Sequence, residues 1–373
     1  MLSRNPMLQF ASGRELSPPD DEDRSGRIAG LMARSRRYCL ITPCRDEARF
    51  ARRTLEAVTS QTIPPALWVI VDDGSKDETP AILDDYAARF PYIRVIRRPD
   101  RGERVLGSGV IDAFYAGYNA SINPDDFDYL CKFDLDLDIP PDYFEQIIIR
   151  MEKNPRLGTC SGKPYFHRDA IRSNSSDGRS LERTQFPLTT RAGYISEKCG
   201  DENSVGMIKF YRTLCFKQIG GFVRYLMWDG IDGHRCRMLG WIAESWDDPE
   251  LRFEHLRPMG TSHKSWWTGR YRHGVGQYYM GTAIPYMIAS SIFRMTRPPA
   301  IIGGVAMLWG YFKSMLTRAP RYDDPRFRNF LRRYQYACLL LGKKRATRLF
   351  DTRQSAAWTH AAAAAPQPIT PAA

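Results

Sequence analysis

Short apolar runs alternate with amphipathic stretches between residues 38 and 161, and this alternation constrains the fold more than any other feature of the sequence. Four runs have the length and apolar content of buried strands: 38–42, 67–71, 93–96 and 127–133. Four stretches have the apolar spacing of helices: 51–60, 79–90, 110–119 and 141–151. Strands separated by helices predict βαβ units, so we expect an α/β fold with a mostly parallel sheet flanked by helices.

The rest of the chain differs in character from this alternating segment. We expect the α/β domain to extend over 38–265 and a helical region to follow over 266–350. Residues 1–37 and 351–373 have no periodic apolar face, so we expect both ends to be disordered. The N-terminus lacks the apolar core of a secretory signal, and the eight cysteines form no C-x-x-C pair. Both observations favour a cytoplasmic protein with reduced thiols.

Three acidic segments stand directly after predicted strands: Pro43–Glu47, Asp72–Asp77 and Asp134–Asp138. The carboxyl ends of parallel strands meet at one edge of a sheet, and ligands of such sheets bind beyond that edge. We therefore expect the three segments to line one crevice.

The segment Asp134–Asp138 carries three alternating carboxylates. Asp134 and Asp136 point to the same face of an extended chain, where their repulsion costs stability unless a cation lies between them. Mg²⁺ and Mn²⁺ prefer oxygen ligands and bridge diphosphates, so we expect Asp134 and Asp136 to hold such an ion. The alternative is a solvated acidic turn.

Two other segments of this edge offer contacts for a nucleotide. Asp72 and Asp73 end a buried strand, where carboxylates can accept hydrogen bonds from a base or a ribose. The alternative is a plain strand-to-helix turn. The first strand closes with four further candidates, for which a charged loop is the alternative: Thr42, Pro43, Asp46 and Glu47.

A basic segment with glycines precedes the helix predicted at 110–119. Arg104 and Gly107 place positive charge and exposed amides near a helix N-terminus, which suits a phosphate. The segment is not a G-x-G-x-x-G fingerprint, because Asp112 stands at the third glycine position, and no G-x-x-x-x-G-K-[ST] motif exists. The sequence therefore gives no support to a dehydrogenase or a P-loop NTPase.

Asp229 and Asp232 open another predicted helix. The helix dipole keeps a carboxylate ionised there, which suits an N-cap and equally a general base. The sequence alone does not separate the two roles, so both residues are candidates.

A basic and aromatic cluster follows His255, which ends a predicted strand. Arg270 and Arg272 stand among Trp and Tyr residues, and such cations can clamp a leaving diphosphate or stack on a base. A lone histidine is more often structural than a ligand, so His255 is a candidate only as part of this cluster.

Four motifs, in their order and spacing, resemble the family 2 glycosyltransferases, which are inverting enzymes of the GT-A fold: Val71–Thr79, Lys132–Phe144, Gly220–Phe222 and Trp228–Trp241. The resemblance covers about 38–280. It implies a GT-A catalytic domain over 38–265, with the helical region as a C-terminal extension.

The resemblance also implies roles for the candidate residues. Asp72 and Asp73 would bind the nucleoside of the donor. Asp134 and Asp136 would form a D-x-D pair, one near the ribose and one on Mg²⁺ or Mn²⁺. His255 would contact the metal or the diphosphate.

Asp229 stands where the family carries the Asp of a Glu-Asp pair, which is the catalytic base. Trp228 replaces the Glu here, so Asp232 remains an alternative.

The implied reaction is an inverting transfer of one sugar from a nucleotide-diphosphate sugar, and we expect UDP as the nucleotide, with GDP and dTDP as the alternatives. The Q-x-x-R-W motif of the processive synthases is absent, and only Gly269–His273 stands in its place, so we expect single-sugar transfer. The implied acceptor is a saccharide, such as a polyprenyl-diphosphate-linked saccharide in cell-surface or exopolysaccharide assembly.

Three other readings stay open. The net charge of +12 suits a nucleic-acid binder, although three acidic clusters on one edge argue against nucleic acid as a partner. The replacement at Trp228 suits a non-catalytic GT-A scaffold. A sugar-nucleotide pyrophosphorylase would carry a glycine-rich loop after its first strand, and Pro43–Glu47 contains no Gly.

Two uncharged segments near the C-terminus, 281–293 and 299–312, are too short to span a bilayer, since 14 helical residues extend about 21 Å. Arg294 and Arg297 lie between them, and Lys313 and Arg318 follow. Two expectations are equally good. The segments form an interfacial hairpin that makes peripheral contact with the inner face of the membrane, or they form a helical subdomain packed on the catalytic domain.

Overall fold

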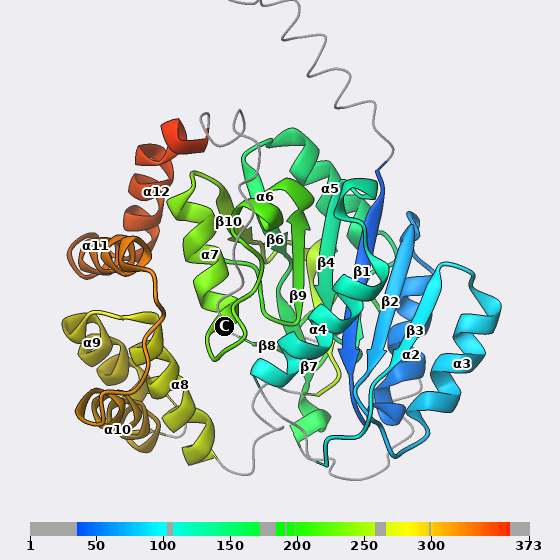
Figure 1. Cartoon of the computed structure of the whole chain (residues 1–373), viewed down its shortest axis with the longest axis horizontal. Coiled ribbons are helices and arrows are strands. Elements are labelled where there is room, and N and C mark those ends of the chain that lie inside the picture. Colours follow the sequence, from blue (N-terminus) through cyan, green and yellow to red (C-terminus); the bar gives the residue numbers. More distant parts are fainter. Residues whose placement is uncertain are drawn as a thin grey trace, which may run out of the picture. The chain divides into compact units, whose positions relative to one another are not determined.

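A seven-stranded sheet forms the centre of the structure (Figure 1). The computed structural model describes residues 36–102, 107–171, 184–190, 192–197, 199–257, 266–297 and 300–358. The strands of the sheet, in spatial order, are β3 (Ile93–Arg97), β2 (Leu67–Asp72), β1 (Tyr38–Cys44), β4 (Tyr129–Phe133), β9 (Ile208–Arg212), β6 (Leu157–Ser161) and β10 (Ile242–Ser245).

All neighbouring strands of this sheet are parallel except β9, which runs antiparallel to both β4 and β6. The α/β fold with a mostly parallel sheet is therefore confirmed. The chain builds β1, β2 and β3 outward in one direction and then returns to place β4 on the other side of β1. Such a reversal leaves a crevice at the carboxyl ends of the two strands, which is where open α/β sheets bind ligands.

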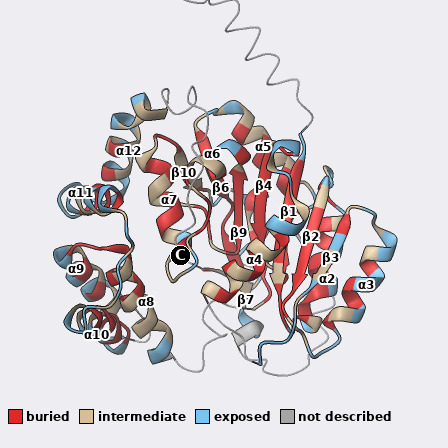
Figure 2. Cartoon of the chain, in the orientation of Figure 1, coloured by how far each residue is buried: buried red, intermediate tan, exposed pale blue. Residues whose placement is uncertain are grey.

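Helices cover both faces of the sheet because side chains of each strand alternate between the faces. One face packs against α2 (Ala48–Thr59), α3 (Thr79–Arg89) and α5 (Tyr143–Lys153). The other face packs against α4 (Ser108–Ser121), α6 (Thr213–Gln218) and α7 (Trp228–Met238). In β1, for example, Tyr38 and Leu40 join the first cluster, and Cys39 and Ile41 join the second. These positions are fully buried, as Figure 2 shows along the strands.

A smaller sheet stands beside the edge that carries the acidic segments. Its order is β5 (Leu137–Asp138), β11 (Phe253–His255), β7 (Pro164–His167) and β8 (Tyr194–Ser196). β11 pairs antiparallel to β5 and places His255 opposite Leu137. The pairing therefore brings His255 next to the acidic segment that begins at Asp134.

The C-terminal extension is helical, as expected. It consists of α8 (Trp266–Met280), α9 (Ile284–Met295), α10 (Ile302–Leu316), α11 (Pro325–Leu341) and α12 (Lys343–Arg353). α12 runs three residues past the boundary at 350, and the indole of Trp358 lies 5.9 Å from that of Trp241. None of the described helices combines the length and the apolar content that crossing a bilayer requires.

Candidate active site

The Asp136 carboxylate lies in a network of charged groups at the carboxyl edge of the main sheet. Nη2 of Arg257 lies 2.7 Å from Oδ2 of Asp136 and 2.7 Å from Oε1 of Glu47. Asp136, Glu47 and His255 are all buried. Burial raises the pKa of Asp136, but the charges of Arg257 and His255 outweigh it and hold that pKa well below its usual range. The structure thus joins the first and third acidic segments through one guanidinium.

His255 is oriented by a second carboxylate. Its Nδ1 atom lies 2.9 Å from Oε2 of Glu197, and its Nε2 atom lies 3.6 Å from Oδ2 of Asp136. Burial lowers the pKa of His255, whereas Asp136 and Glu197 raise it, and the result is a pKa of about 10. A carboxylate behind a histidine is the usual way in which proteins aim the other ring nitrogen at a metal.

Asp134 is bound by a lysine from its own strand. The Lys132 Nζ atom donates to Oδ1 of Asp134 at 2.5 Å and to the carbonyl oxygen of Gly206 at 2.9 Å. Burial raises the pKa of Asp134, Lys132 lowers it, and the charge of Asp136 raises it, so that the pKa lies above its usual value. Two carboxylates that oppose each other's ionisation form a site that a cation would stabilise.

This donor set fits a divalent ion only together with a substrate. Within the residues described, no three or more His, Cys, Asp or Glu side chains gather closely enough to hold a metal. Mg²⁺ is usually held by one or two carboxylates and completed by substrate phosphates, and Asp134 and Asp136 match that pattern. Nε2 of His255 faces the same carboxylate. The residues therefore fit an ion that arrives with a diphosphate, not a preformed protein cage.

Asp72 and Asp73 lie at the end of β2 and are both buried. Oδ1 of Asp72 accepts a hydrogen bond from the Ser75 amide at 2.9 Å, which closes the turn. Asp73 pairs with Arg98 at 2.8 Å and with Arg101. Asp73 thus lies between two guanidinium groups, and Asp72 closes the turn that follows β2.

The four candidates after the first strand fall into different environments. Thr42 is fully buried within β1, and its hydroxyl accepts a hydrogen bond from the Trp68 indole at 2.8 Å. Pro43 is a strand residue paired with Val71. Asp46 has φ of 53° and accepts from the Lys76 amide, which fixes the loop. Of the four, Glu47 is the one that the structure joins to the Asp136 network.

The basic segment before α4 is described only in part, since Arg104 lies outside the described residues. Gly107 precedes α4 with φ of 85°, and a Cβ atom there would lie 2.9 Å from Leu226 and 3.5 Å from Nη2 of Arg272. The N-terminus of α4 and the Arg272 side chain on α8 are therefore neighbours. Arg270, by contrast, lies against α10. A Cβ atom added at Gly303 of that helix would lie 3.8 Å from Cγ of Arg270.

Asp229 and Asp232 occupy opposite environments on α7. Asp232 is buried, and it pairs with Lys209 at 2.7 Å and accepts from the Tyr211 hydroxyl. Asp229 is an exposed residue, and a Cβ at Gly206 would lie 3.0 Å from its Oδ2 atom. Loss of water around the carboxyl raises the pKa of Asp229, Lys209 lowers it, and the charge of Asp232 raises it, so that the pKa lies above its usual value.

One lysine connects the last two parts of the site. Lys132 binds both Asp134 and the carbonyl of Gly206, and a Cβ at Gly206 would lie 3.0 Å from Oδ2 of Asp229. The charge of Lys132 also lowers the pKa of Asp229, so this ammonium group acts on both aspartates.

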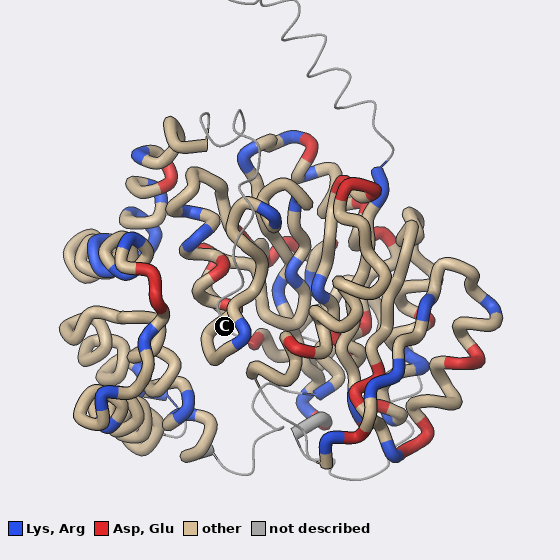
Figure 3. Tube along the Cα trace, viewed as in Figure 1, with Lys and Arg blue, Asp and Glu red and all other residues tan. Residues whose placement is uncertain are grey.

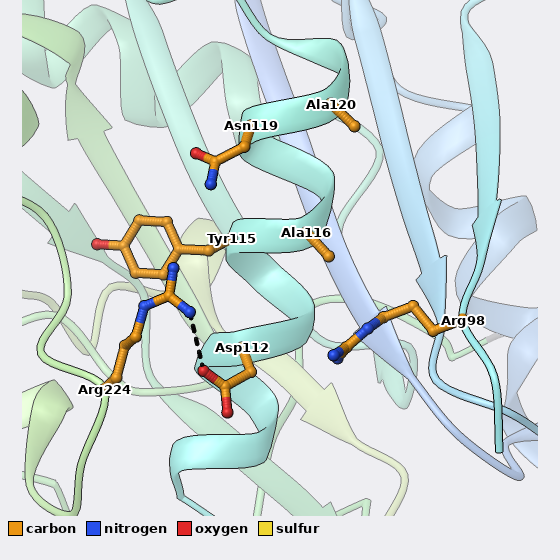
Figure 4. A pocket seen from close by; sticks show the side chains of 7 residues that line it. All are labelled: Arg98, Asp112, Tyr115, Ala116, Asn119, Ala120 and Arg224. Carbon is orange, nitrogen blue, oxygen red and sulfur yellow. Dashed lines mark hydrogen bonds and ion pairs between the residues drawn. The ribbon is translucent and has the colours of Figure 1, made fainter. Parts of the chain in front are cut away.

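A separate hollow of 460 Å³ lies on the outer side of α4 (Figure 4). Arg224 pairs there with Asp112 at 3.1 Å and lies 4.6 Å above the ring of Tyr115. Arg98, which also binds Asp73, borders it. The remaining lining residues are uncharged: Ala116, Asn119 and Ala120. No residue predicted for the site lines this hollow.

Sequence reasoning missed three residues that hold the site together: Lys132, Glu197 and Arg257. Arg257 stands two positions after His255, and in an extended segment such residues share a face. That spacing was a usable signal. Nothing in the sequence indicated Glu197, which is 58 positions from its partner His255.

The chain is similar in sequence to a glycosyltransferase family and to two synthases. The model of "Glycosyl transferase family 2" matches residues 39–219. A poly-beta-1,6-N-acetyl-D-glucosamine synthase of Staphylococcus epidermidis is 29% identical over 183 residues, which is 48% of this chain and 40% of the synthase. A beta-monoglucosyldiacylglycerol synthase of Synechocystis is 27% identical over 113 residues, or 30% of this chain and 22% of that protein. This chain therefore spans well under half the length of either relative.

Among solved structures, a mannosyltransferase of Pyrobaculum calidifontis in complex with GDP-Man and Mn²⁺ aligns with 92% of this chain and 93% of its own, at 15% identity and a TM-score of 0.43.

Proposed function

The chain belongs to the family 2 glycosyltransferases through its domain at 39–219, and on this premise we propose that it transfers one sugar from a nucleotide-diphosphate sugar to an acceptor hydroxyl with inversion at the anomeric carbon. The observation that carries the proposal is that Lys132 binds Asp134 and that its charge also acts on Asp229, whose pKa it lowers. We propose that the exposed Asp229 carboxylate accepts the acceptor's proton and that the acidic segment at Asp134 faces the donor.

Asp229 is the residue that we propose as the general base. An acceptor hydroxyl has a pKa far above 7, so it needs a carboxylate to take its proton as the oxygen attacks the anomeric carbon. The raised pKa of Asp229 makes it a stronger base than an ordinary aspartate, and its exposure lets an acceptor reach it. Asp232 is engaged by Lys209 and Tyr211 in the core, so we assign it a structural role.

The acceptor oxygen forms its bond to the anomeric carbon while the bond from that carbon to the diphosphate oxygen breaks on the opposite face, and the leaving nucleoside diphosphate takes the electron pair. We propose that Asp134 and Asp136 hold Mg²⁺ or Mn²⁺, which when bound would stabilise the negative charge of the diphosphate. His255 would join them as a ligand after losing the proton that Asp136 and Glu197 stabilise on its ring in the absence of the ion. Arg257 and Arg272 add positive charge, and the N-terminus of α4 at Gly107 offers amides for a phosphate oxygen.

Asp73 and Asp72 are proposed to face the nucleoside, at the edge where β2 ends. The guanidinium groups of Arg98 and Arg101 neutralise Asp73 and fix its position. We keep UDP as the proposed nucleotide.

A saccharide on a lipid carrier is the proposed acceptor, and the cytoplasmic side of a membrane is the proposed location. The two relatives support a saccharide or lipid acceptor, since one is named as the synthase of a polysaccharide and the other as the synthase of a glucosyl-diacylglycerol lipid. The absence of a Q-x-x-R-W motif favours transfer of one sugar over polymerisation.

Incubation with UDP-, GDP- and dTDP-sugars, with and without Mn²⁺, tests the proposal through released nucleoside diphosphate. Asp229→Asn is expected to slow release by about 10²–10⁴-fold, and Asp136→Ala is expected to abolish it at every Mn²⁺ concentration. A folded protein that turns over no donor, with or without a saccharide acceptor, would favour the non-catalytic scaffold. Retardation of DNA or RNA at moderate salt would instead favour the nucleic-acid binder.

A further inference from the structure

Nearly every residue of α9 and α10 that is exposed, and so pale blue in Figure 2, is apolar in the sequence. In α9 these residues are Ile284, Pro285, Ile288, Ile292 and Phe293. In α10 they are Ile302, Val305, Trp309, Lys313 and Leu316. We call these ten residues the α9–α10 face. Of the 15 large hydrophobic residues that are exposed within the described part of the chain, Leu214 alone lies outside α8–α11 and the residues that join them.

In α10 the small side chains face the protein and large apolar side chains face outward, which is the reverse of a helix that packs on the core of a water-soluble protein. The buried side of α10 is rich in small residues, namely Gly303, Gly304, Ala306, Gly310 and Ser314, whereas Trp309 and Leu316 point outward with 52% and 75% exposure. The glycines allow close helix contact, because a Cβ at Gly310 would lie 2.2 Å from the backbone of α8. A Cβ at Gly304 would lie 2.4 Å from the backbone of α9. Small residues between helices and large apolar residues on the outside are typical of helices that contact lipid.

Charge around this face has one sign. Residues 255–358 contain 18 of the 54 Lys and Arg of the chain but only 3 of the 42 Asp and Glu, so the excess positive charge of the protein belongs to the helical extension. From 255 to 322 no acidic residue occurs at all. Figure 3 shows the same imbalance along α8–α12. Arg294 lies in the last turn of α9 and Arg297 follows that helix, while Lys313 lies in the last turn of α10 and Arg318 follows it.

We infer that the α9–α10 face docks on the surface of an anionic lipid bilayer. The apolar residues enter the headgroup region, and the flanking Arg and Lys side chains contact anionic headgroups. The helices lie on the surface and do not cross it, since the 15 residues of α10 extend about 22 Å, short of a hydrocarbon core of about 30 Å. This inference goes beyond the proposed sugar transfer and is tested without it.

A second copy of the chain fits this face less well. Symmetric pairing would place the same patch against itself and bring Arg294, Arg297 and Lys313 of two molecules together without an acidic residue to compensate. A membrane with anionic headgroups supplies the opposite charge.

Flotation of the full chain with vesicles tests the inference. The chain is expected to float with vesicles of phosphatidylcholine and phosphatidylglycerol at least about tenfold more than with phosphatidylcholine alone, and less as salt is added. Phe293→Glu and Trp309→Glu are each expected to weaken flotation, and the double variant to abolish it. Both positions are more than half exposed, so the fold is expected to tolerate them, which thermal unfolding checks.

Leu214→Glu is the matched control, since it places the same charge at an exposed leucine on α6. It is expected to float like the wild type, and so is Asp229→Asn, whose loss of sugar transfer would leave flotation intact. Equal flotation of the double variant and the wild type would overturn the inference. The inference would also be overturned if the chain formed a dimer in solution that Trp309→Glu dissociates. It would equally be overturned if the chain bound nucleic acid and did not float with vesicles.

Discussion

Nη2 of Arg257 lies 2.7 Å from Oδ2 of Asp136, and the same nitrogen reaches Glu47. This guanidinium holds two buried carboxylates together at the edge of the sheet. Arg257→Ala is therefore expected to lower the free energy of unfolding by about 3 kcal/mol, because it leaves buried charges without their partner. Denaturant unfolding measures the change.

The matched control is Arg252→Ala. Arg252 is as exposed as Arg257, but its partner Asp247 lies on the surface. A surface pair contributes about 0–1 kcal/mol, so the control is expected to lose little. Equal losses for the two variants would contradict the role given to Arg257.

Removal of divalent ions is the second prediction. If Asp134 and Asp136 hold an ion together with the donor diphosphate, chelation is expected to lower the transfer rate about 100-fold, and Mn²⁺ or Mg²⁺ to restore it. The binding of UDP, followed by thermal shift, is expected to require the ion as well. Asp136→Ala is expected to show no shift with UDP and Mn²⁺. A shift of equal size in chelator would argue against a bridging ion.

The two aspartates of α7 give the third prediction, because the same substitution should have different effects. Asp229→Asn is expected to lower kcat by about 10²–10⁴-fold with little change in unfolding. Asp232→Asn is expected to destabilise the protein by about 3 kcal/mol, since the fully buried Lys209 loses its counter-ion. Kinetics and denaturant unfolding of both variants separate the two roles.

The pH dependence of transfer is the fourth prediction. If Asp229 is the general base, it acts only when ionised, so kcat/KM is expected to rise with pH through the pKa of Asp229. That pKa lies above its ordinary value because the carboxyl loses surrounding water and because the charge of Asp232 opposes its ionisation. The rise is therefore expected at a pH higher than about 3.9, the value for a free aspartate. The residual rate of Asp229→Asn is expected to lack this rise.

His234 provides a pH prediction for stability. Burial, followed by the charges of Arg237 and Lys343, lowers the pKa of His234 to about 3, and its ring lies 5.2 Å from that of Tyr334. The unfolded chain takes up a proton below about pH 6.5, whereas the folded chain does not, so the stability is present above that pH and is lost as the pH falls towards 3.

Between pH 7 and pH 5 this protonation is expected to remove about 2 kcal/mol from the free energy of unfolding. His234→Phe keeps an aromatic ring in contact with Tyr334. Between pH 7 and pH 5 this variant is expected to lose about 2 kcal/mol less of its free energy of unfolding than the wild type. Denaturant unfolding of both proteins at the two pH values gives the difference. Equal losses would show that His234 is protonated in the folded protein.

Much of the fold was predictable, because local pattern and elementary topology suffice for it. The apolar runs at 38–42 and 67–71 become β1 and β2, and their continuous burial follows from helices on both faces of the sheet. The placement of Asp72 and Asp134 at strand ends follows from the runs at 67–71 and 127–133. The small sheet was not predictable in this way, since β5 and β8 have two and three residues and too little pattern to detect.

The partners of the charged residues depend on the tertiary structure. Arg257 reaches Asp136 across 121 positions of sequence, and only the pairing of β11 with β5 brings them together. Thr42 seemed equivalent to Glu47 in the sequence, but alternation along β1 turns its hydroxyl towards Trp68 in the core.

The sequence by itself determined the α/β class, the edge at which the acidic segments gather and the basic character of the helical extension, because each of these follows from residues near one another in the chain. The tertiary structure alone decided that Asp229 faces outward while Asp232, three residues later, meets Lys209 and Tyr211 in the core. The physical reason is that less than one turn of helix separates them, so the packing of α7 against the sheet sets which carboxylate is buried.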